Sequence, residues 1–278
     1  MTTPHPHPLA VLIACTLPLA AMAQAAPQTM MPTDTHIFAG PAMPRHGIEI
    51  YSSRQHLSAG YASWSEVGLR GHYESGAHLL QMELTSTRRF GESGAYLGLG
   101  DTVTINPDWF GSLAVGAGDG ASYLPRYRVD GFINRKLLPE KNLVGTLGLG
   151  YYRAPDGHVD RSVSLGGTYY FSQPWIVQAE VKFNTSNPGN VHTRQQFVAL
   201  TWGQDKHTQI TGRYAGGAEG YQSIGAGASL VNFRSHQASL AVRHWLSANG
   251  GISAQVEHYK NPFYQRNGAQ LGLFWQFQ

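Results

Sequence analysis

Residues 175–184 read WIVQAEVKFN, and their pattern predicts the kind of fold. Its polar residues Gln178, Glu180 and Lys182 alternate with apolar ones, so the pattern repeats at every second position. That period is typical of a β-strand with one apolar and one polar face, and it is not the period of a helix. The segment also has about the length that a strand tilted by about 45° needs to cross a bilayer.

The same alternation recurs along most of the chain, and no helix-length amphipathic run interrupts it. A soluble sandwich or small barrel shares this pattern, but about fourteen strands enclose a lumen too wide for their own side chains to fill. We therefore expect polar side chains inside and apolar ones facing lipid. The prediction is an all-β fold, a transmembrane antiparallel β-barrel with strands near 48–57, 64–73, 77–89, 95–105, 109–117, 123–138, 143–153, 161–171, 175–184, 192–202, 206–215, 235–246, 251–259 and 267–277.

The composition agrees with strands that have one face in lipid. Of the 278 residues, 42% are hydrophobic, 13% are charged and 33 are glycine. Soluble domains carry about 25% charged residues, so the chain does not resemble an ordinary cytoplasmic enzyme. A mean hydropathy of −0.26 excludes a bundle of apolar helices. The net charge of +3 is too small to indicate nucleic-acid binding.

The N-terminal residues predict secretion. Residues 9–23 read LAVLIACTLPLAAMA, an apolar run that is too short to span a bilayer and ends on a small-x-small cleavage pattern. We expect a signal peptide over 1–23, a flexible periplasmic leader over 24–46 and the barrel over 47–278. Residues 12–15 also resemble a lipobox, but few apolar residues precede Cys15. Because Cys15 is the single cysteine and lies in the signal peptide, the mature chain has no thiol for a disulfide or a metal site.

The connections between the expected strands differ in length. An even strand number puts both ends of the barrel in the periplasm. The connections at 74–76, 139–142, 172–174, 203–206 and 247–250 then lie on that side and are short, whereas the longer ones at 118–124, 154–160, 185–191, 215–234 and 260–266 lie outside. Residues 221–231 alternate weakly, and we interpret them as an extracellular hairpin arm or loop because one more membrane strand would break the even count.

Aromatic and glycine positions refine this picture. Strand glycines such as Gly116 and Gly148 lack the following helix of a phosphate loop, so we expect them where the wall bends or leaves room in the lumen. Aromatic residues fall at or near strand ends beside turns, where a membrane-interface girdle belongs. The predicted girdle consists of Tyr169, Phe171, Trp175, Trp202, Trp275 and Phe277.

The chain resembles the YaiO family of outer-membrane β-barrel proteins over residues 61–277. The motifs that carry the resemblance are Trp64-Ser65-Glu66, Arg89-Phe90-Gly91, LPRYR at 124–128 and the aromatic C-terminal strand LGLFWQF at 271–277. In the usual terminal signal of such barrels the aromatic residue is last, whereas here Gln278 follows Phe277. The resemblance implies an outer-membrane location and a barrel fold, and some members resemble parts of surface-polysaccharide systems. It supplies no catalytic residues.

One motif points to chemistry. His56 and Ser58 form a His-x-Ser pair like that of outer-membrane phospholipases and lipid A deacylases, in which the histidine activates the serine. The asparagine that follows that serine in those enzymes is Ala59 here, and a chain with 13 histidines is expected to contain such a pair by chance. The other histidines lack the spacing of a zinc site, so we expect no metal, no cofactor and no catalytic residue.

Charged residues on the polar strand faces are the remaining candidates. We expect them to face the lumen with a basic excess, and to contact a solute there. Arg126 and Arg128 are expected to be the most exposed of them. The alternative is an internal network of ion pairs that braces or blocks the barrel. The residues are Glu66, Arg70, Glu83, Arg89, Arg126, Arg128, Asp130, Lys182 and Arg194, with Lys136, Glu180, Arg213 and Glu257 on the same faces.

The sequence thus predicts a porin-like barrel of the Gram-negative outer membrane that passes or binds a solute or a surface polysaccharide and is not an enzyme. Two alternatives stay open: a barrel enzyme acting on lipid or lipopolysaccharide, and a structural or receptor barrel that uses its extracellular loops. The expected partners are outer-membrane lipid and lipopolysaccharide, the barrel-insertion machinery at the C-terminal strand, and polysaccharide export components.

Overall fold

The computed structural model describes residues 46–172 and 174–277, so the expected signal peptide, the leader up to residue 45 and Gln278 lie outside the described residues. Within the described part, no helix is long and apolar enough to span a membrane. The regular elements there are fourteen strands: β1 (His46–Leu57), β2 (Trp64–Ser75), β3 (His78–Arg89), β4 (Glu92–Thr104), β5 (Trp109–Gly118), β6 (Tyr127–Leu137), β7 (Leu143–Arg153), β8 (Val159–Tyr170), β9 (Trp175–Asn187), β10 (Val191–Gly203), β11 (Thr208–Gly225), β12 (Ala228–Trp245), β13 (Gly250–Lys260) and β14 (Gln265–Phe277).

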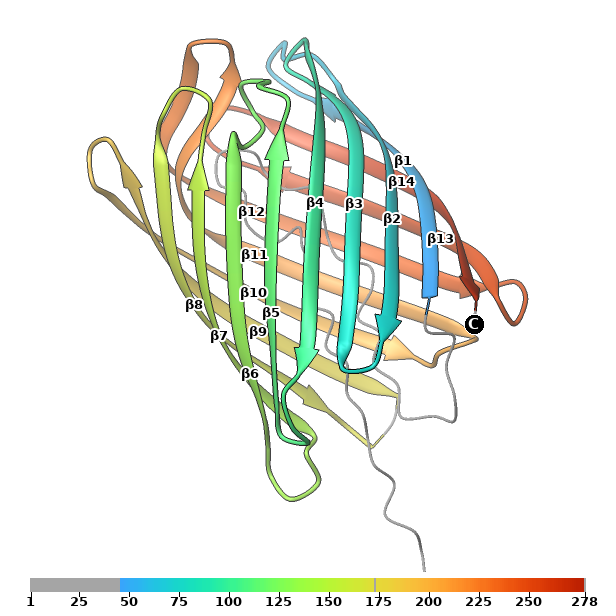
Figure 1. Cartoon of the computed structure of the whole chain (residues 1–278). Coiled ribbons are helices and arrows are strands. Elements are labelled where there is room, and N and C mark those ends of the chain that lie inside the picture. Colours follow the sequence, from blue (N-terminus) through green and yellow to red (C-terminus); the bar gives the residue numbers. More distant parts are fainter. Residues whose placement is uncertain (1–45, 173, 278) are drawn as a thin grey trace, which may run out of the picture.

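The strands form one closed antiparallel barrel in which every strand pairs with its neighbours in sequence and β1 pairs with β14 (Figure 1). The closing seam runs from His46 opposite Phe277 to Leu57 opposite Arg266. The predicted all-β barrel of fourteen antiparallel strands is confirmed. We call the end of the barrel that holds His46 and Phe277 the terminal end and the opposite end the distal end.

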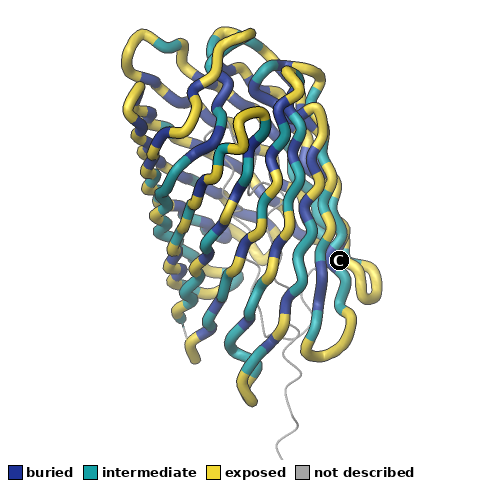
Figure 2. The backbone as a smooth tube through the Cα atoms, turned by 90° about the vertical axis from the view of Figure 1, so that its left-hand side faces the viewer, coloured by how far each residue is buried: buried dark blue, intermediate teal, exposed yellow. Residues whose placement is uncertain are grey.

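Side chains alternate between the two faces of the barrel wall. In β1, Glu49 and Tyr51 are buried inside, whereas Ile48 and Ile50 are about half exposed on the outside. Figure 2 shows the same alternation of buried and exposed positions along the other strands. Polar residues therefore fill the buried face and aliphatic residues the exposed one, which is the reverse of a soluble barrel.

Glycines make room for aromatic rings on the inner wall. A methyl group at Gly68 would collide with the ring of Tyr51, and one at Gly116 would collide with Tyr96. At Gly148 it would lie 2.6 Å from the ring of Phe132. Since each glycine belongs to the strand next to its aromatic residue, the rings lie flat along the wall and do not point across the lumen. These strand glycines leave room inside the barrel, as expected, and the rings of neighbouring aromatic residues fill that room.

The differences from the predicted strand boundaries that matter most for the distal end are in two places. The sixth strand begins at Tyr127 and not at residue 123, because Leu124 and Pro125 belong to a packed turn at the distal end. The predicted loop over 215–234 is mostly strand, since β11 and β12 stay paired up to Gly225 opposite Ala228. Residues 221–231 are therefore a hairpin arm, and the difference in loop length between the two ends is smaller than predicted.

Candidate functional site

The interior of the barrel is lined with charges of both signs. Its bases and acids are similar in number, so the predicted basic excess is not found among the interior residues that the structure describes. The interior bases are Arg70, Arg89, Arg128, Lys136, Lys182, Arg213, Arg243 and Arg266, and the acids are Glu49, Glu66, Glu83, Asp130, Asp160, Glu180, Glu219 and Glu257.

On β1 to β3 these charges form ion pairs. Arg70 Nε lies 3.1 Å from Glu83, and Arg89 lies 3.1 Å from Glu66. The Tyr51 hydroxyl donates to both acids, at 3.1 Å to Glu66 and 3.4 Å to Glu83. A buried carboxylate needs such partners because burial strongly disfavours a lone charge. The internal ion-pair network that the sequence left open is present along this wall.

The network continues across the seam, where arginines also lie over aromatic rings. Arg243 lies 3.5 Å from Glu49 and 3.5 Å above the centre of the Phe274 ring. Arg266 pairs with Glu257 at 3.1 Å and lies 4.5 Å above the Trp64 ring. Flat guanidinium groups over aromatic faces add a cation–π attraction to the ion pair. This side of the interior is therefore held in one arrangement by its own side chains.

The predicted lumen residues separate into two groups. Glu66, Arg70, Glu83, Arg89, Arg128, Asp130 and Lys182 face the interior. Arg128 is buried and donates from Nε to Asp130 at 2.7 Å, so it is not an exposed member of the set. Arg126 lies exposed in the turn before β6, and Arg194 is exposed on the outer face of β10, the face that also carries Val198 and Leu200. Contact between the interior set and a solute stays a prediction.

The β11–β12 hairpin extends across the distal opening. β11 pairs with β10 only as far as Gly217, and beyond it pairs only with β12. Gly217 has a φ of +148° and comes so close to the Arg194 carbonyl that a methyl group there would collide with it. A backbone conformation that glycine alone adopts easily therefore marks the point where the hairpin leaves the wall. We call residues 218–233 the mouth hairpin.

Polar contacts join the mouth hairpin to four distal turns. The Ser223 hydroxyl donates to Ser122 Oγ in the β5–β6 turn at 3.0 Å, although four strands, β7 to β10, separate β6 from β11 around the ring. The Tyr221 hydroxyl donates to the Pro188 carbonyl at 2.7 Å, and its ring stacks on His158 at 5.1 Å. The fourth turn, β13–β14, supplies Tyr264, whose hydroxyl accepts a hydrogen bond from Gln222. The hairpin thus spans the opening.

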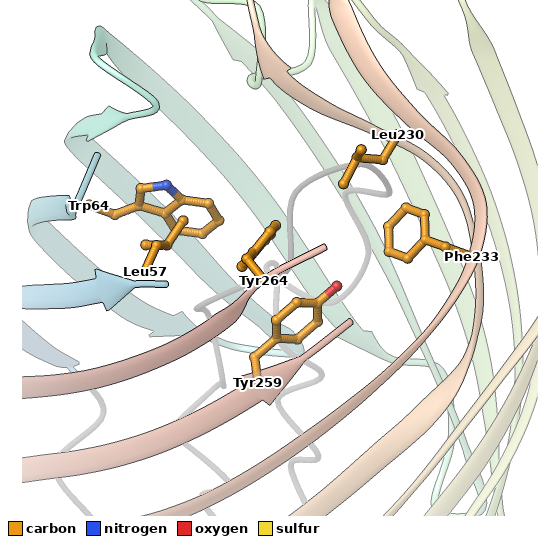
Figure 3. Packing of buried hydrophobic residues seen from close by; sticks show 6 residues of the cluster. All are labelled: Leu57, Trp64, Leu230, Phe233, Tyr259 and Tyr264. Atoms are coloured by element: carbon orange, nitrogen blue, oxygen red, sulfur yellow. The ribbon is translucent and has the colours of Figure 1, made fainter. Parts of the chain in front are cut away.

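An apolar cluster fixes the base of the mouth hairpin (Figure 3). Leu230 and Phe233 of β12 pack into one buried group with residues of β1, β2, β13 and the β13–β14 turn. The Tyr259 hydroxyl within this group donates to Glu219 of β11 at 2.9 Å. The other members of the cluster are Leu57, Trp64, Tyr259 and Tyr264.

His158, in the β7–β8 turn, is the titratable residue beneath the hairpin tip. Its ring nitrogens lie 2.9 Å from Asp156 and 3.6 Å from Asp160, and its faces contact Tyr152 and Tyr221. Burial acts to lower its pKa, but hydrogen bonding and attraction to Asp160 and Asp156 outweigh burial, so the pKa of His158 is raised above its ordinary value. The imidazolium form is thus stabilised in the closed mouth.

The His-x-Ser pair does not form a catalytic arrangement in this structure. His56 is exposed on the outer face of β1, opposite Asn267 of β14. Ser58 lies in the β1–β2 turn, where its hydroxyl accepts a hydrogen bond from the Gln265 backbone nitrogen at 2.8 Å. Within residues 46–172 and 174–277, no three histidine, aspartate or glutamate side chains are grouped as metal ligands.

The six predicted girdle residues gather at the terminal end. Trp175 lies opposite Trp202, and Trp275 lies opposite Ile48 near the end of the seam. Phe171, Trp175, Trp202, Trp275 and Phe277 are each at least 40% exposed on the outer face, and Tyr169 packs against Phe171. Their contact with a membrane interface stays a prediction.

A closed antiparallel barrel with aliphatic residues outside and polar residues inside defines the class of outer-membrane β-barrel proteins. Residues 45–222 match the YaiO membrane beta barrel domain. The chain belongs to that family.

Solved structures agree with the fold. A bacterial polysaccharide outer membrane secretin has a TM-score of 0.54 at 11% identity, over 84% of this chain and 99% of the other. The CymD monoaromatic hydrocarbon channel has a TM-score of 0.56 at 7% identity, over 84% and 88%. The translocator domain of the autotransporter NalP from Neisseria meningitidis has a TM-score of 0.50 at 8% identity, over 85% and 90%. No match was found among the curated proteins.

Proposed function

We propose that this protein forms a gated passage for a polar solute or a segment of surface polysaccharide across the bacterial outer membrane, with the distal end at the cell surface. The observation that carries the proposal is the mouth hairpin, which spans the opening of a polar barrel and is held to the far rim by side chains, not by a backbone ladder. Side-chain contacts of this kind open at far lower cost than a strand pairing in the wall.

The proposed orientation rests on the general pattern of bacterial outer-membrane barrels. Such barrels have short periplasmic turns and longer extracellular connections, and in this barrel the β11–β12 hairpin extends beyond the wall at the distal end. The hairpin then faces the medium, where it meets the solute before the charged interior does. We expect the protein not to be an enzyme, because Ser58 serves as a backbone hydrogen-bond acceptor and His56 lies on the lipid-facing surface.

A disulfide across the mouth tests the passage. Ser122 and Ser223 are joined by a hydrogen bond, and Cys15 is the single cysteine of the sequence and lies in the expected signal peptide. The double variant S122C/S223C therefore gives one defined crosslink. In planar bilayers we expect the reduced protein to conduct ions and the oxidised protein to conduct several-fold less.

The two single-cysteine variants are matched controls and should not respond to the oxidant. A second variant, with residues 219–232 replaced by a short glycine-rich turn, should conduct continuously. If this shortened barrel carries no current, passage is ruled out. Release of fatty acid from lipopolysaccharide vesicles by the intact protein would favour the enzyme alternative.

A further inference from the structure

Outward-facing basic residues gather at the distal end of the barrel. Each is exposed on the outer face, five near the distal end of their strands and Arg234 at the base of the mouth hairpin, opposite Ala218. We call this set the basic rim: Arg54, Arg88, Arg161, Arg194, Arg234 and Lys260.

The register of β1 to β4 places two of these arginines in one row. Arg54 lies opposite Ser65, and Ser65 lies opposite Arg88. Because neighbouring strands are about 4.8 Å apart, the two arginine backbones stand about 10 Å apart with a serine hydroxyl between them. Three outward rows follow from the terminal side to the distal side: Ile50–Leu69–Leu84–Leu97, Ser52–Val67–Ser86–Ala95 and Arg54–Ser65–Arg88–Ser93.

From the terminal side to the distal side, these rows change from apolar to polar, as a lipid does from its acyl chains to its headgroup. An aliphatic row comes first, a mixed row follows, and a row of hydrogen-bond donors ends the wall about 13 Å from the aliphatic row, at about 3.3 Å per residue. Among the described residues, the outward positions in the distal halves of the strands hold no aspartate or glutamate. The rim therefore presents positive charge directly above an apolar surface, with no carboxylate on the same face of the distal halves of these strands in the part of the chain that the structure describes.

The two ends of the outer surface differ in chemistry. The terminal end carries tryptophan, tyrosine and phenylalanine, and its exposed Arg135 lies 5.2 Å above the Trp109 ring. The distal end carries the basic rim together with hydroxyl and amide side chains such as Ser93 and Asn267. Tyr127 and Phe183 are exposed there as well, but no described tryptophan is. Aromatic residues suit a neutral headgroup region, whereas arginine forks suit phosphate.

From this arrangement we infer that the basic rim binds the phosphate groups of lipopolysaccharide in the outer leaflet, with the acyl chains against the aliphatic rows. Arginine and serine donate to the phosphate oxygens, and no bond is made or broken. The inference takes only the choice of leaflet from the proposed orientation and is independent of passage through the lumen. It assigns a lipid site to the outside of the barrel, where the sequence had placed Arg194 inside.

Binding of lipid A tests the inference directly. The full chain is purified in detergent, and its affinity for bis-phosphorylated lipid A is measured by native mass spectrometry. We expect the Arg54→Gln/Arg88→Gln variant to lose at least roughly tenfold in affinity, because two charge-assisted phosphate contacts are removed. A second variant from another part of the rim, Arg234→Gln/Lys260→Gln, should also bind more weakly. Arg135→Gln at the terminal end is the matched control and should bind as the wild type does.

Two further probes define the ligand chemistry. Dephosphorylated lipid A should bind much more weakly than the phosphorylated form, and phosphatidylglycerol should not match it. Unchanged affinity in both rim variants, or equal loss in the Arg135→Gln control, would overturn the inference. Equal binding of dephosphorylated lipid A would remove phosphate as the recognised group, and equal binding of phosphatidylglycerol would replace lipopolysaccharide with any anionic lipid. None of these results depends on whether the barrel conducts.

Discussion

The Tyr51 ring packs on the inner wall in the space that is left because Gly68 has no side chain. A side chain at residue 68 would have to occupy the space of the Tyr51 ring, whose hydroxyl bonds Glu66 and Glu83. One glycine thus keeps an ion-pair network in place on the neighbouring strands.

We expect Gly68→Ala to lower the free energy of unfolding by about 1–3 kcal/mol, the usual cost of overpacking. Gly71→Ala on the same strand is the matched control, because its new methyl group would meet its nearest atom at an ordinary 3.7 Å. Urea unfolding in lipid vesicles, followed by tryptophan fluorescence, measures both. Equal loss in the two variants would mean that β2 resists alanine in general.

His158 should make the mouth hairpin sensitive to pH. Its folded pKa is raised by Asp160 and Asp156, so its contribution is complete below the ordinary pKa of about 6.5 and is lost as pH rises through the raised value. We expect a spin label at Ala226→Cys, in the hairpin turn, to become more mobile as pH rises from about 5.5 to about 8. The His158→Asn variant should show no such change, and a label that loosens equally in that variant would assign the effect to another group.

At the scale of elements, the mouth hairpin depends on the point where β11 leaves the wall. Gly217→Ala should displace the hairpin, because the added methyl group would collide with the Arg194 carbonyl and the φ of +148° disfavours any side chain. We expect a several-fold rise in bilayer conductance while the barrel stays folded.

The matched control for this variant is Gly212→Ala, because residue 212 also lies on β11 and a methyl group there meets no atom within 4 Å. Its conductance should equal that of the wild type. A Gly217→Ala protein that conducts no more than the wild type would show that this bend does not position the hairpin.

The strands themselves could be predicted, and residues 221–231 could be interpreted as a hairpin arm or loop, but the contacts that seat the hairpin across the mouth could not be predicted. The alternation along residues 175–184 indicates β9 correctly, because one face of the strand meets lipid and the other meets polar side chains. In the hairpin that rule no longer applies, since residues 218–233 have left the wall and bury Leu230 and Phe233 in the apolar cluster at the distal end. The contacts of Tyr221 and Ser223 with distant turns leave no periodic signal in the sequence.

Over the whole barrel, the net positive charge of the described residues lies outside the lumen. The interior charges balance, while Arg54, Arg88 and Arg194 face outward. The sequence held the signal for this placement, because Arg194 shares its parity with Val198 and Leu200, and Arg54 shares its parity with Ile48 and Ile50. Parity with aliphatic neighbours is thus a better guide to the face of a charged residue than its charge.

A balanced interior should select weakly between ions. With the mouth hairpin shortened, we expect a chloride-to-potassium permeability ratio within about twofold of one, because a passing ion senses the summed charge of the wall. The reversal potential in a potassium chloride gradient measures this ratio. Lys182→Gln in this shortened protein should shift the ratio toward potassium, and strong anion selectivity without that substitution would support the basic excess that the sequence predicts.

The hairpin contacts couple turns that in most barrels vary independently. Four separate turns contact residues 221–223 of β11. They do so through Ser122, His158, Pro188 and Tyr264. An insertion in one of these turns, such as one that evades a phage or an antibody, would also disturb the contacts of residues 221–223 with the other three turns. Surface variation in this protein should therefore arise as coordinated changes in several turns, and the distal surface should diversify more slowly than exposed loops usually do.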